Sequence, residues 1–329
     1  MTHIEVLNWA EGYSKVNLKN LEITCLKDIK DAFISDLKNY FSLAALARSG
    51  SAQKELSDKA HTLLFSVRVK LERNIDYLLQ DNLSKGFDLH DVFFKNSFFG
   101  SSKKQGVSLR MPLSSCTPSS LCAGGCYAHD VLDASPFAMI RGVVNGCIAF
   151  LFEKGNANDR KSILDKLRPH TLKAVKNARK ELKDLPSGFR RRPYIRFSHV
   201  GEVANYPNFA NALAMQVRSL SRKGVDCVIY TRHSKARELN PELWIMNFTL
   251  DPSSLNRVKW IPKQARIVYS AFGGITSSLA EVNFLEHHRH QHLAQTEGDG
   301  KICPATKPET IERTCDACRC NTCFVKPNN

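Results

Sequence analysis

Three cysteines lie within eleven positions near the middle of the chain, in a loop rich in Pro, Ser and Gly. The segment CTPSSLCAGGCYAHD contains Cys116, Cys122 and Cys126, separated by five and three residues. Structural zinc sites are closed by four ligands and usually contain paired C-x2-C knuckles, which this segment lacks. Three thiolates can instead bind a cubane iron–sulfur cluster and leave one iron open to a small molecule. We expect such a cluster; a zinc site completed by His129 or a distant cysteine, and thiols without metal, are the alternatives.

The end of the chain has a second concentration of cysteines. Its members are Cys303, Cys315, Cys318, Cys320 and Cys323. Since four ligands close a structural site, one cysteine is spare, and the spacing makes Cys320 the doubtful member. We expect a 4Fe-4S cluster or a zinc ion here that stabilises the fold of the tail.

The remaining cysteines and a histidine pair give weaker signals. Cys25, Cys147 and Cys227 are isolated in apolar surroundings, which predicts packed thiols. His288 and His292 could form a metal pair on one helix face. No acidic motif is nearby, so an exposed polar helix face or an anion-binding patch is the favoured interpretation.

The bulk composition predicts a globular protein of the cytoplasm. The 329 residues are 43% hydrophobic and 24% charged, and no apolar run is long enough to cross a bilayer. The first residues also lack the basic and apolar regions of a signal peptide. In a reducing compartment, eleven cysteines indicate metal or catalytic use rather than a disulfide framework.

The charge balance is strongly basic, with a formal net charge of +15. Such an excess predicts a partner that is a nucleic acid or another polyanion. A solvated basic face is the alternative, because no recognition motif accompanies the charge.

Periodicity predicts an α/β fold preceded by helices. Apolar residues at helical spacing predict helices at residues 26–47, 53–79, 136–152, 161–182 and 209–223, and a short helix is expected near 236–243. Short apolar segments predict strands at 193–198, 226–231, 243–250 and 266–271. Strands separated by helical crossovers form a mainly parallel sheet. We therefore expect an N-terminal helical region over residues 1–95, an α/β core over 96–300 and a cysteine-rich tail over 301–329.

Polar residues follow three of the predicted strands. His199, Gly201 and Glu202 follow the first, Arg232 follows the second and Asp251 follows the third. The carboxyl ends of parallel strands meet at one edge of a sheet, where α/β proteins place their active sites. This pattern predicts a site at that edge.

Several sequence blocks resemble the phage "gene product 88-like" family. In order, they are NSFFGSSKKQGVSLRMPLSSC, CAGGCYA, YIRFSHVGE, IYTR, TLD and ICPA, followed by the cysteine-dense tail. The resemblance covers roughly residues 95–325 and leaves out the N-terminal helices. It implies a protein encoded by a phage or mobile element and placed in the host cytoplasm, with no membrane contact.

A more distant similarity is to radical S-adenosylmethionine (SAM) enzymes, which combine a three-cysteine cluster with a partial β/α barrel. Their usual spacing is C-x3-C-x2-C with an aromatic residue beside the last cysteine. Here Tyr127 follows Cys126, and Gly201-Glu202 follows a strand, as does the SAM-binding "GE" of that family. The wider C-x5-C-x3-C spacing is a departure from the pattern.

This similarity implies a partial β/α barrel, SAM as a cofactor and an auxiliary cluster in the tail. Tyr127, Gly201 and Glu202 would then be cofactor-binding residues, with Glu202 taking the SAM ammonium group. Residues implied near the substrate are His199, Arg232 and Asp251, with Arg196 as a weaker candidate. An electron-donating protein would be a partner.

Two functions follow from these observations. The first is a radical-SAM-like enzyme that acts on a nucleotide or nucleic acid. The second is a non-enzymatic nucleic-acid-binding or replication-associated protein with structural iron–sulfur or zinc sites.

Overall fold

The computed structural model describes most of the chain up to residue 286. The described residues are 2–16, 21–49, 54–85, 94, 98–102, 106–124, 126, 135–183, 192–198, 200–272 and 277–286. The predicted cysteine-rich tail over residues 301–329 lies outside these residues, as do His288 and His292.

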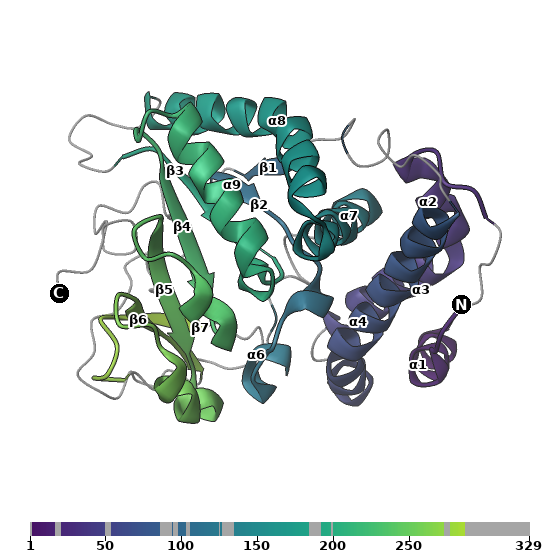
Figure 1. Cartoon of the computed structure of the whole chain (residues 1–329). Coiled ribbons are helices and arrows are strands. Elements are labelled where there is room, and N and C mark those ends of the chain that lie inside the picture. Colours follow the sequence, from purple (N-terminus) through teal and green to yellow (C-terminus); the bar gives the residue numbers. More distant parts are fainter. Residues whose placement is uncertain are drawn as a thin grey trace.

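A mixed, mostly parallel sheet of seven strands lies at the centre of the described fold (Figure 1). The strands are β1 (Phe99–Ser102), β2 (Gly106–Leu109), β3 (Tyr194–Phe197), β4 (Asp226–Thr231), β5 (Trp244–Leu250), β6 (Arg266–Phe272) and β7 (Val282–Glu286). They lie side by side in sequence order. β1 and β2 pair antiparallel, and every later neighbour pairs parallel. The predicted α/β class and mainly parallel sheet are confirmed.

The four predicted strands correspond to β3–β6, whereas β1, β2 and β7 were not predicted. β1 and β2 have four residues each and β7 has five, so a period-two pattern is hard to detect in them. Gly106 begins β2 with φ +66°, a left-handed conformation that glycine adopts without strain. The short β1–β2 hairpin therefore lies in a segment whose sequence shows no regular period.

Three helices cover one face of the sheet: α7 (Pro136–Lys154), α8 (Ala157–Lys183) and α9 (Pro207–Leu220). Aromatic rings connect them to the strands through Phe98, whose ring also packs edge-on against Phe99 of β1. Phe209 of α9 packs edge-on against Phe98 and against Phe152 of α7, and Phe197 of β3 packs edge-on against Trp244 of β5. These contacts lie in the main hydrophobic core, which fixes the sheet against its helices.

Helix α7 is apolar and mostly buried. By length and composition it could cross a membrane, contrary to the expectation that no apolar run is long enough. However, 61% of the apolar window is buried within the fold, and it contains core residues such as Ile140 and Ile148. The core helix of a folded domain has the same composition, which explains the difference.

Among the described residues, four helices precede the sheet: α1 (His3–Gly12), α2 (Leu26–Ala32), α3 (Ile34–Ala47) and α4 (Lys54–Ser84). The single helix predicted at 26–47 is broken at Phe33, where φ −110° and ψ 20° are not helical. Helices α2 and α4 contact α7, and one buried cluster extends from α1 to β6. The predicted boundary at residue 95 stays a prediction.

The isolated cysteines differ in burial. Cys147 and Cys227 are buried in the core, as the sequence predicted. The same prediction for Cys25 is wrong, because Cys25 is exposed. It occupies the N-cap of α2, where its backbone N–H donates to Asp28 Oδ2 at 2.9 Å.

Candidate functional site

The cysteine-bearing loop lies between β2 and α7, and its described residues contain two short helical turns. They are η2 (Leu113–Ser115) and α6 (Ser120–Gly124). Cys116 follows η2, Cys122 lies within α6, and both side chains are partly buried. Cys116 and Cys126 both pack against a small apolar cluster formed by Leu113 and Val200. The loop therefore contacts the segment that follows β3.

Several acidic groups lie close to the Cys116 thiol. Burial raises the pKa of the Cys116 thiol well above its usual value, and the charges of Glu202, Cys126, Cys122 and Glu72 raise it further. The three cysteines and Glu202 thus form one electrostatic neighbourhood. A cationic cluster core would compensate this crowding of acids, so the donor chemistry suits a metal centre. Within the described part of the chain, however, no three Cys, His, Asp or Glu side chains are arranged as a metal-binding group.

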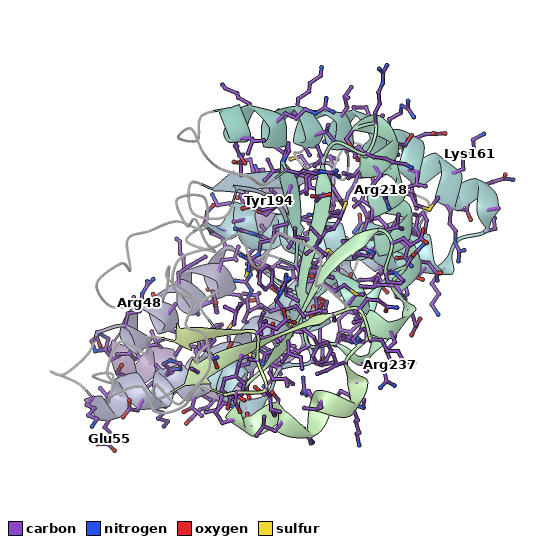
Figure 2. All side chains as sticks on the ribbon, turned by 90° about the vertical axis from the view of Figure 1, so that its left-hand side faces the viewer. Arg48, Glu55, Lys161, Tyr194, Arg218 and Arg237 are labelled. Carbon is purple, nitrogen blue, oxygen red and sulfur yellow. The ribbon has the colours of Figure 1, made fainter. Side chains whose placement is uncertain are left out.

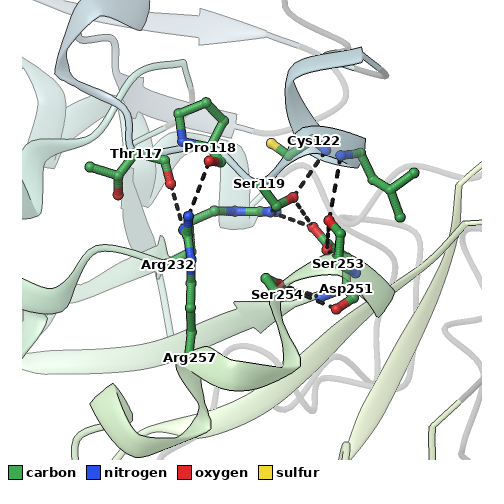
Figure 3. Close-up of polar contacts among 10 residues, drawn as sticks. Thr117, Pro118, Ser119, Cys122, Arg232, Asp251, Ser253, Ser254 and Arg257 are labelled. Carbon is green, nitrogen blue, oxygen red and sulfur yellow. Dashed lines mark hydrogen bonds and ion pairs between the residues drawn. The ribbon is translucent and has the colours of Figure 1, made fainter.

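Asp251, at the end of β5, connects the loop to the sheet (Figure 3). It is fully buried, and its Oδ2 accepts a hydrogen bond from Arg232 Nη1 at 2.7 Å and a short one from Ser119 Oγ. Its Oδ1 accepts from the backbone N–H and the hydroxyl of Ser253 at 3.0 and 2.8 Å. Burial tends to raise the pKa of Asp251, but these hydrogen bonds and the Arg232 charge hold it below its usual value. The carboxylate is therefore ionised, and both of its oxygens accept hydrogen bonds.

Ser119 is the loop residue that binds Asp251. Its Oγ accepts hydrogen bonds from Arg232 Nη1 at 3.2 Å and from the backbone N–H of Cys122 at 3.1 Å. A serine that accepts a bond from the third residue after it behaves as a helix N-cap, here of α6. Ser119 therefore fixes the backbone of Cys122 against Asp251. Ser119 was not predicted as a site residue: its position three residues before Cys122 is a capping signal, but nothing in the sequence indicates its contact with Asp251.

A second arginine holds the start of the same loop. Arg257 Nη1 donates to the carbonyl oxygen of Thr117 at 2.5 Å, and its Nη2 donates to that of Pro118 at 3.0 Å. Arg257 lies in η6 (Pro252–Trp260), directly after Asp251. Asp251 and the segment after it therefore form several hydrogen bonds with the loop between Cys116 and Cys122, which Figure 3 shows together.

Glu202 lies after β3 and is almost completely buried, with 5% of its surface exposed. Its Oε1 accepts hydrogen bonds from Ser198 Oγ and from the backbone N–H of Ala204, both at 3.3 Å. Burial raises the pKa of Glu202 to about 7, although hydrogen bonds from Thr231, Ala204, Arg232 and Ser198 oppose the shift. The backbone N–H of Glu202 donates to Ser115 Oγ at 2.8 Å, one residue before Cys116.

Gly201 allows the close approach of the loop to this segment. Its φ of +72° is left-handed, and a Cβ at this position would lie 2.4 Å from the carbonyl oxygen of Pro112. The backbone N–H of Met111 donates to the carbonyl of Val200 at 2.7 Å, which holds the two segments together. Any other residue at position 201 would push the loop away from Glu202.

Helix α4 supports the loop from the other side. Glu72 Oε2 accepts a hydrogen bond from the backbone N–H of Ser114 at 2.8 Å. Its Oε1 accepts from Arg68 Nε at 2.6 Å, and both side chains of this ion pair are almost fully buried. This support was not predicted, because nothing in the sequence of α4 indicates where its buried charges point.

The predicted site residues have different outcomes. The structure brings six of them to the carboxyl edge of the sheet or to the loop against it: Cys116, Cys122, Gly201, Glu202, Arg232 and Asp251. Cys126 packs on the same apolar cluster. Arg196 instead lies over the ring of Tyr230, with its guanidinium 4.3 Å from the ring centroid. Predicted residues outside the described part of the chain are Tyr127, His129, His199, Cys303, Cys315, Cys318, Cys320 and Cys323.

Comparisons with known proteins give no family for this chain. No family model matches it, and neither a curated protein nor a solved structure was found to match it. The two resemblances in the sequence therefore remain predictions. Function rests on the chemistry of the loop and of the sheet edge.

Proposed function

We propose that this chain is a radical-SAM-like iron–sulfur enzyme in which Cys116, Cys122 and Cys126 bind a 4Fe-4S cluster at the carboxyl edge of the sheet. The observation that carries the proposal is the fastening of the cysteine loop to Asp251, Arg232 and the backbone of Glu202. A phage or mobile element would encode the enzyme, and it would act in the host cytoplasm.

The order of the strands supports a partial β/α barrel. Strands β2–β7 are parallel and adjacent in sequence order, without a point where the order reverses. Barrels are wound in this way, whereas doubly wound sheets reverse their order beside the first strand. In a barrel the loops at the carboxyl ends of the strands form the active site, which is where the cysteine loop lies.

The chain's own residues have separate roles in this proposal. A cluster held by three thiolates supplies a position for SAM and one electron for its cleavage, the electron coming from a donor protein. Glu202 would bind the ammonium group of SAM, because its carboxyl group is buried close to Cys116. Ser119, Asp251 and Arg232 would hold the loop in place and keep water from its base. Tyr127 and His199 complete the proposed cofactor and substrate contacts, and the tail cysteines would bind an auxiliary cluster or zinc.

A second candidate function is a non-enzymatic nucleic-acid-binding or replication-associated protein with structural metal sites. The net charge of +15 and the exposed basic side chains of α8 favour it. In that protein the three-cysteine site would be closed by a fourth protein ligand and would not respond to SAM.

Metal analysis tests the proposal directly. The protein, purified anaerobically, should contain about four iron and four sulfide per three-cysteine site. Cys116→Ala, Cys122→Ala and Cys126→Ala should each lose that iron. Cys25→Ala is the matched control, because Cys25 is exposed and isolated, and its iron content should equal that of the wild type. Zinc in place of iron, or an unchanged iron content in Cys122→Ala, would overturn the proposal.

A further inference from the structure

Helix α8 has a dense set of exposed basic side chains, which we call the α8 basic face. Its members are Lys161, Lys166, Arg168, Lys173, Lys176, Arg179 and Lys180. The exposed acids of the helix are Asp159 and Asp165, and none of the ion pairs found among the described residues includes a member of the α8 basic face. Figure 2 shows α8 along one edge of the molecule with its long side chains directed outward.

The basic face is opposite the side of α8 that packs on the fold. Leu167, Val175 and Ala178 are buried, whereas Lys173, Lys176 and Lys180 lie at i, i+3 and i+7 on the exposed side. Like charges at such spacings repel one another and destabilise the helix. An anionic partner that lies along the helix would remove this repulsion.

The basic surface continues beyond α8 onto the turn between α9 and β4. Arg179 Nη2 donates to the carbonyl oxygen of Ser221 at 2.8 Å, which places this turn beside the end of α8. The next two residues, Arg222 and Lys223, are both exposed. Both have a left-handed backbone, with φ of +48° and +59°. Two elements therefore contribute to one basic surface, and Figure 2 also places Arg218 of α9 close beneath α8.

We propose that the α8 basic face binds the phosphate backbone of double-stranded DNA. Residues 161–180 span about 28 Å at 1.5 Å per residue, a length that can follow several successive phosphates. Contacts with phosphates alone carry no sequence information, so binding is independent of DNA sequence. This surface lies on an element that contributes none of the described cysteine-loop contacts, so the inference does not rest on the proposed cluster. It deepens the second candidate function, because it names the kind of nucleic acid and the surface that binds it.

The composition of α8 distinguishes duplex DNA from other polyanions. The helix contains no Phe, Tyr or Trp, so it offers no ring on which the bases of a single strand could stack. Leu172 is its one large hydrophobic residue that is exposed, at 38%, which gives no apolar face for insertion into a membrane surface.

A salt titration of DNA binding tests the inference. Fluorescence anisotropy of a labelled duplex of arbitrary sequence should show an affinity that falls steeply as salt rises. The full-length triple variant Lys173→Glu/Lys176→Glu/Lys180→Glu should lower the affinity at least about tenfold. It should also reduce the magnitude of the slope of log K against log salt by nearly three, because each phosphate contact contributes about 0.9 to that slope. The corresponding Gln variant should show a smaller loss in the same direction.

The matched control has the same change in charge at exposed lysines elsewhere: Lys54→Glu/Lys259→Glu/Lys263→Glu. It should bind the duplex almost as the wild type does. The inference fails if both triple variants weaken binding equally, or if the wild type does not bind the duplex. It also fails if the α8 variant loses binding only to single strands or to vesicles of anionic phospholipid. Iron content and circular dichroism of each variant separate these results from loss of the cluster or of the fold.

Discussion

Asp251 holds the cysteine loop through both of its carboxylate oxygens. We expect Asp251→Asn to lower the free energy of unfolding by about 3 kcal/mol, because it leaves the largely buried charge of Arg232 without its counter-ion. The Arg232 side chain is 14% exposed and lies 2.7 Å from Asp251 Oδ2. Urea unfolding monitored by circular dichroism measures the loss.

Asp165→Asn is the control for this change, since Asp165 is an exposed carboxylate on α8. A surface substitution of this kind changes stability by less than about 0.5 kcal/mol. If the two variants unfolded at the same urea concentration, the assigned role of Asp251 in fastening the loop would be wrong.

His233 makes the fold sensitive to moderate acid. It is buried, and its Nδ1 accepts a hydrogen bond from the backbone N–H of Lys235 at 3.1 Å. Burial, together with the charges of Lys235 and Arg257, lowers the pKa of His233 from 6.5 to about 4. Between these values the unfolded chain binds a proton that the folded chain does not, so the free energy of unfolding falls as the pH falls through this window.

His233→Asn should reduce this pH dependence, because an Asn Oδ1 accepts the same hydrogen bond without titrating. Urea unfolding at neutral pH and at about pH 5 should show a smaller loss of stability in the variant than in the wild type. An equal decline in both proteins would show that His233 does not titrate as described.

The sequence identified some residues of the site and missed others for a physical reason. Glu202, Arg232 and Asp251 could be predicted because they follow recognisable strands, and the ends of parallel strands meet at one edge. Ser119 and Arg257 could not, because their partners are set by the path of the loop. Ser119 lies 132 residues from Asp251 in the sequence, and no local pattern encodes that contact.

At the scale of elements, α4 is coupled to the cysteine loop through one buried ion pair. Glu72→Ala removes the acceptor of the Ser114 N–H and leaves Arg68 buried without its counter-ion. Loss of such a partner costs about 3–5 kcal/mol. Because Ser114 is two residues from Cys116, we expect the loop to loosen and Cys116 of the metal-free protein to be alkylated faster by iodoacetamide, as measured by peptide mass spectrometry.

Ser57→Ala in the same helix is the comparison. Ser57 Oγ donates to the carbonyl of Ala47 at 2.8 Å, so this change also removes a buried hydrogen bond of α4 but does not touch the loop. Cys116 should react at the wild-type rate in Ser57→Ala and at an intermediate rate in Glu72→Gln, which retains an acceptor oxygen. Equal rates in Glu72→Ala and the wild type would contradict the coupling.

Elements with a strong period were predicted well, and short ones were not. The predicted strand at 226–231 coincides with β4, and α7, α8 and α9 lie close to the predicted helices. The predicted helix near 236–243 is instead the shorter turn η5 (Ser234–Glu238). The end of α9 was predicted three residues too late, because Arg222 and Lys223 adopt left-handed φ values that no helix period reveals.

At the scale of the whole molecule, the described fold brings the loop after β2 and the ends of β3, β4 and β5 to one place. Crossover connections between parallel strands make this convergence necessary for the strand ends, and the sequence therefore predicted it. The position of the loop depends on contacts with α4 and with the segment after β5, which the chain order alone does not determine. The α/β class could be predicted, but the contacts of the loop with α4 and with the segment after β5 could not.

The electron paramagnetic resonance spectrum of the reduced three-cysteine cluster, with and without SAM, is the most direct test of the central claim. In the Cys315→Ala/Cys318→Ala variant the proposed tail cluster would be lost, so the spectrum would report the proposed site of Cys116, Cys122 and Cys126. A cluster with an open iron should give a 4Fe-4S signal that shifts when SAM is added, and Glu202→Gln should weaken the shift. A spectrum that SAM leaves unchanged would contradict the account. The absence of iron from the Cys315→Ala/Cys318→Ala variant would contradict it as well.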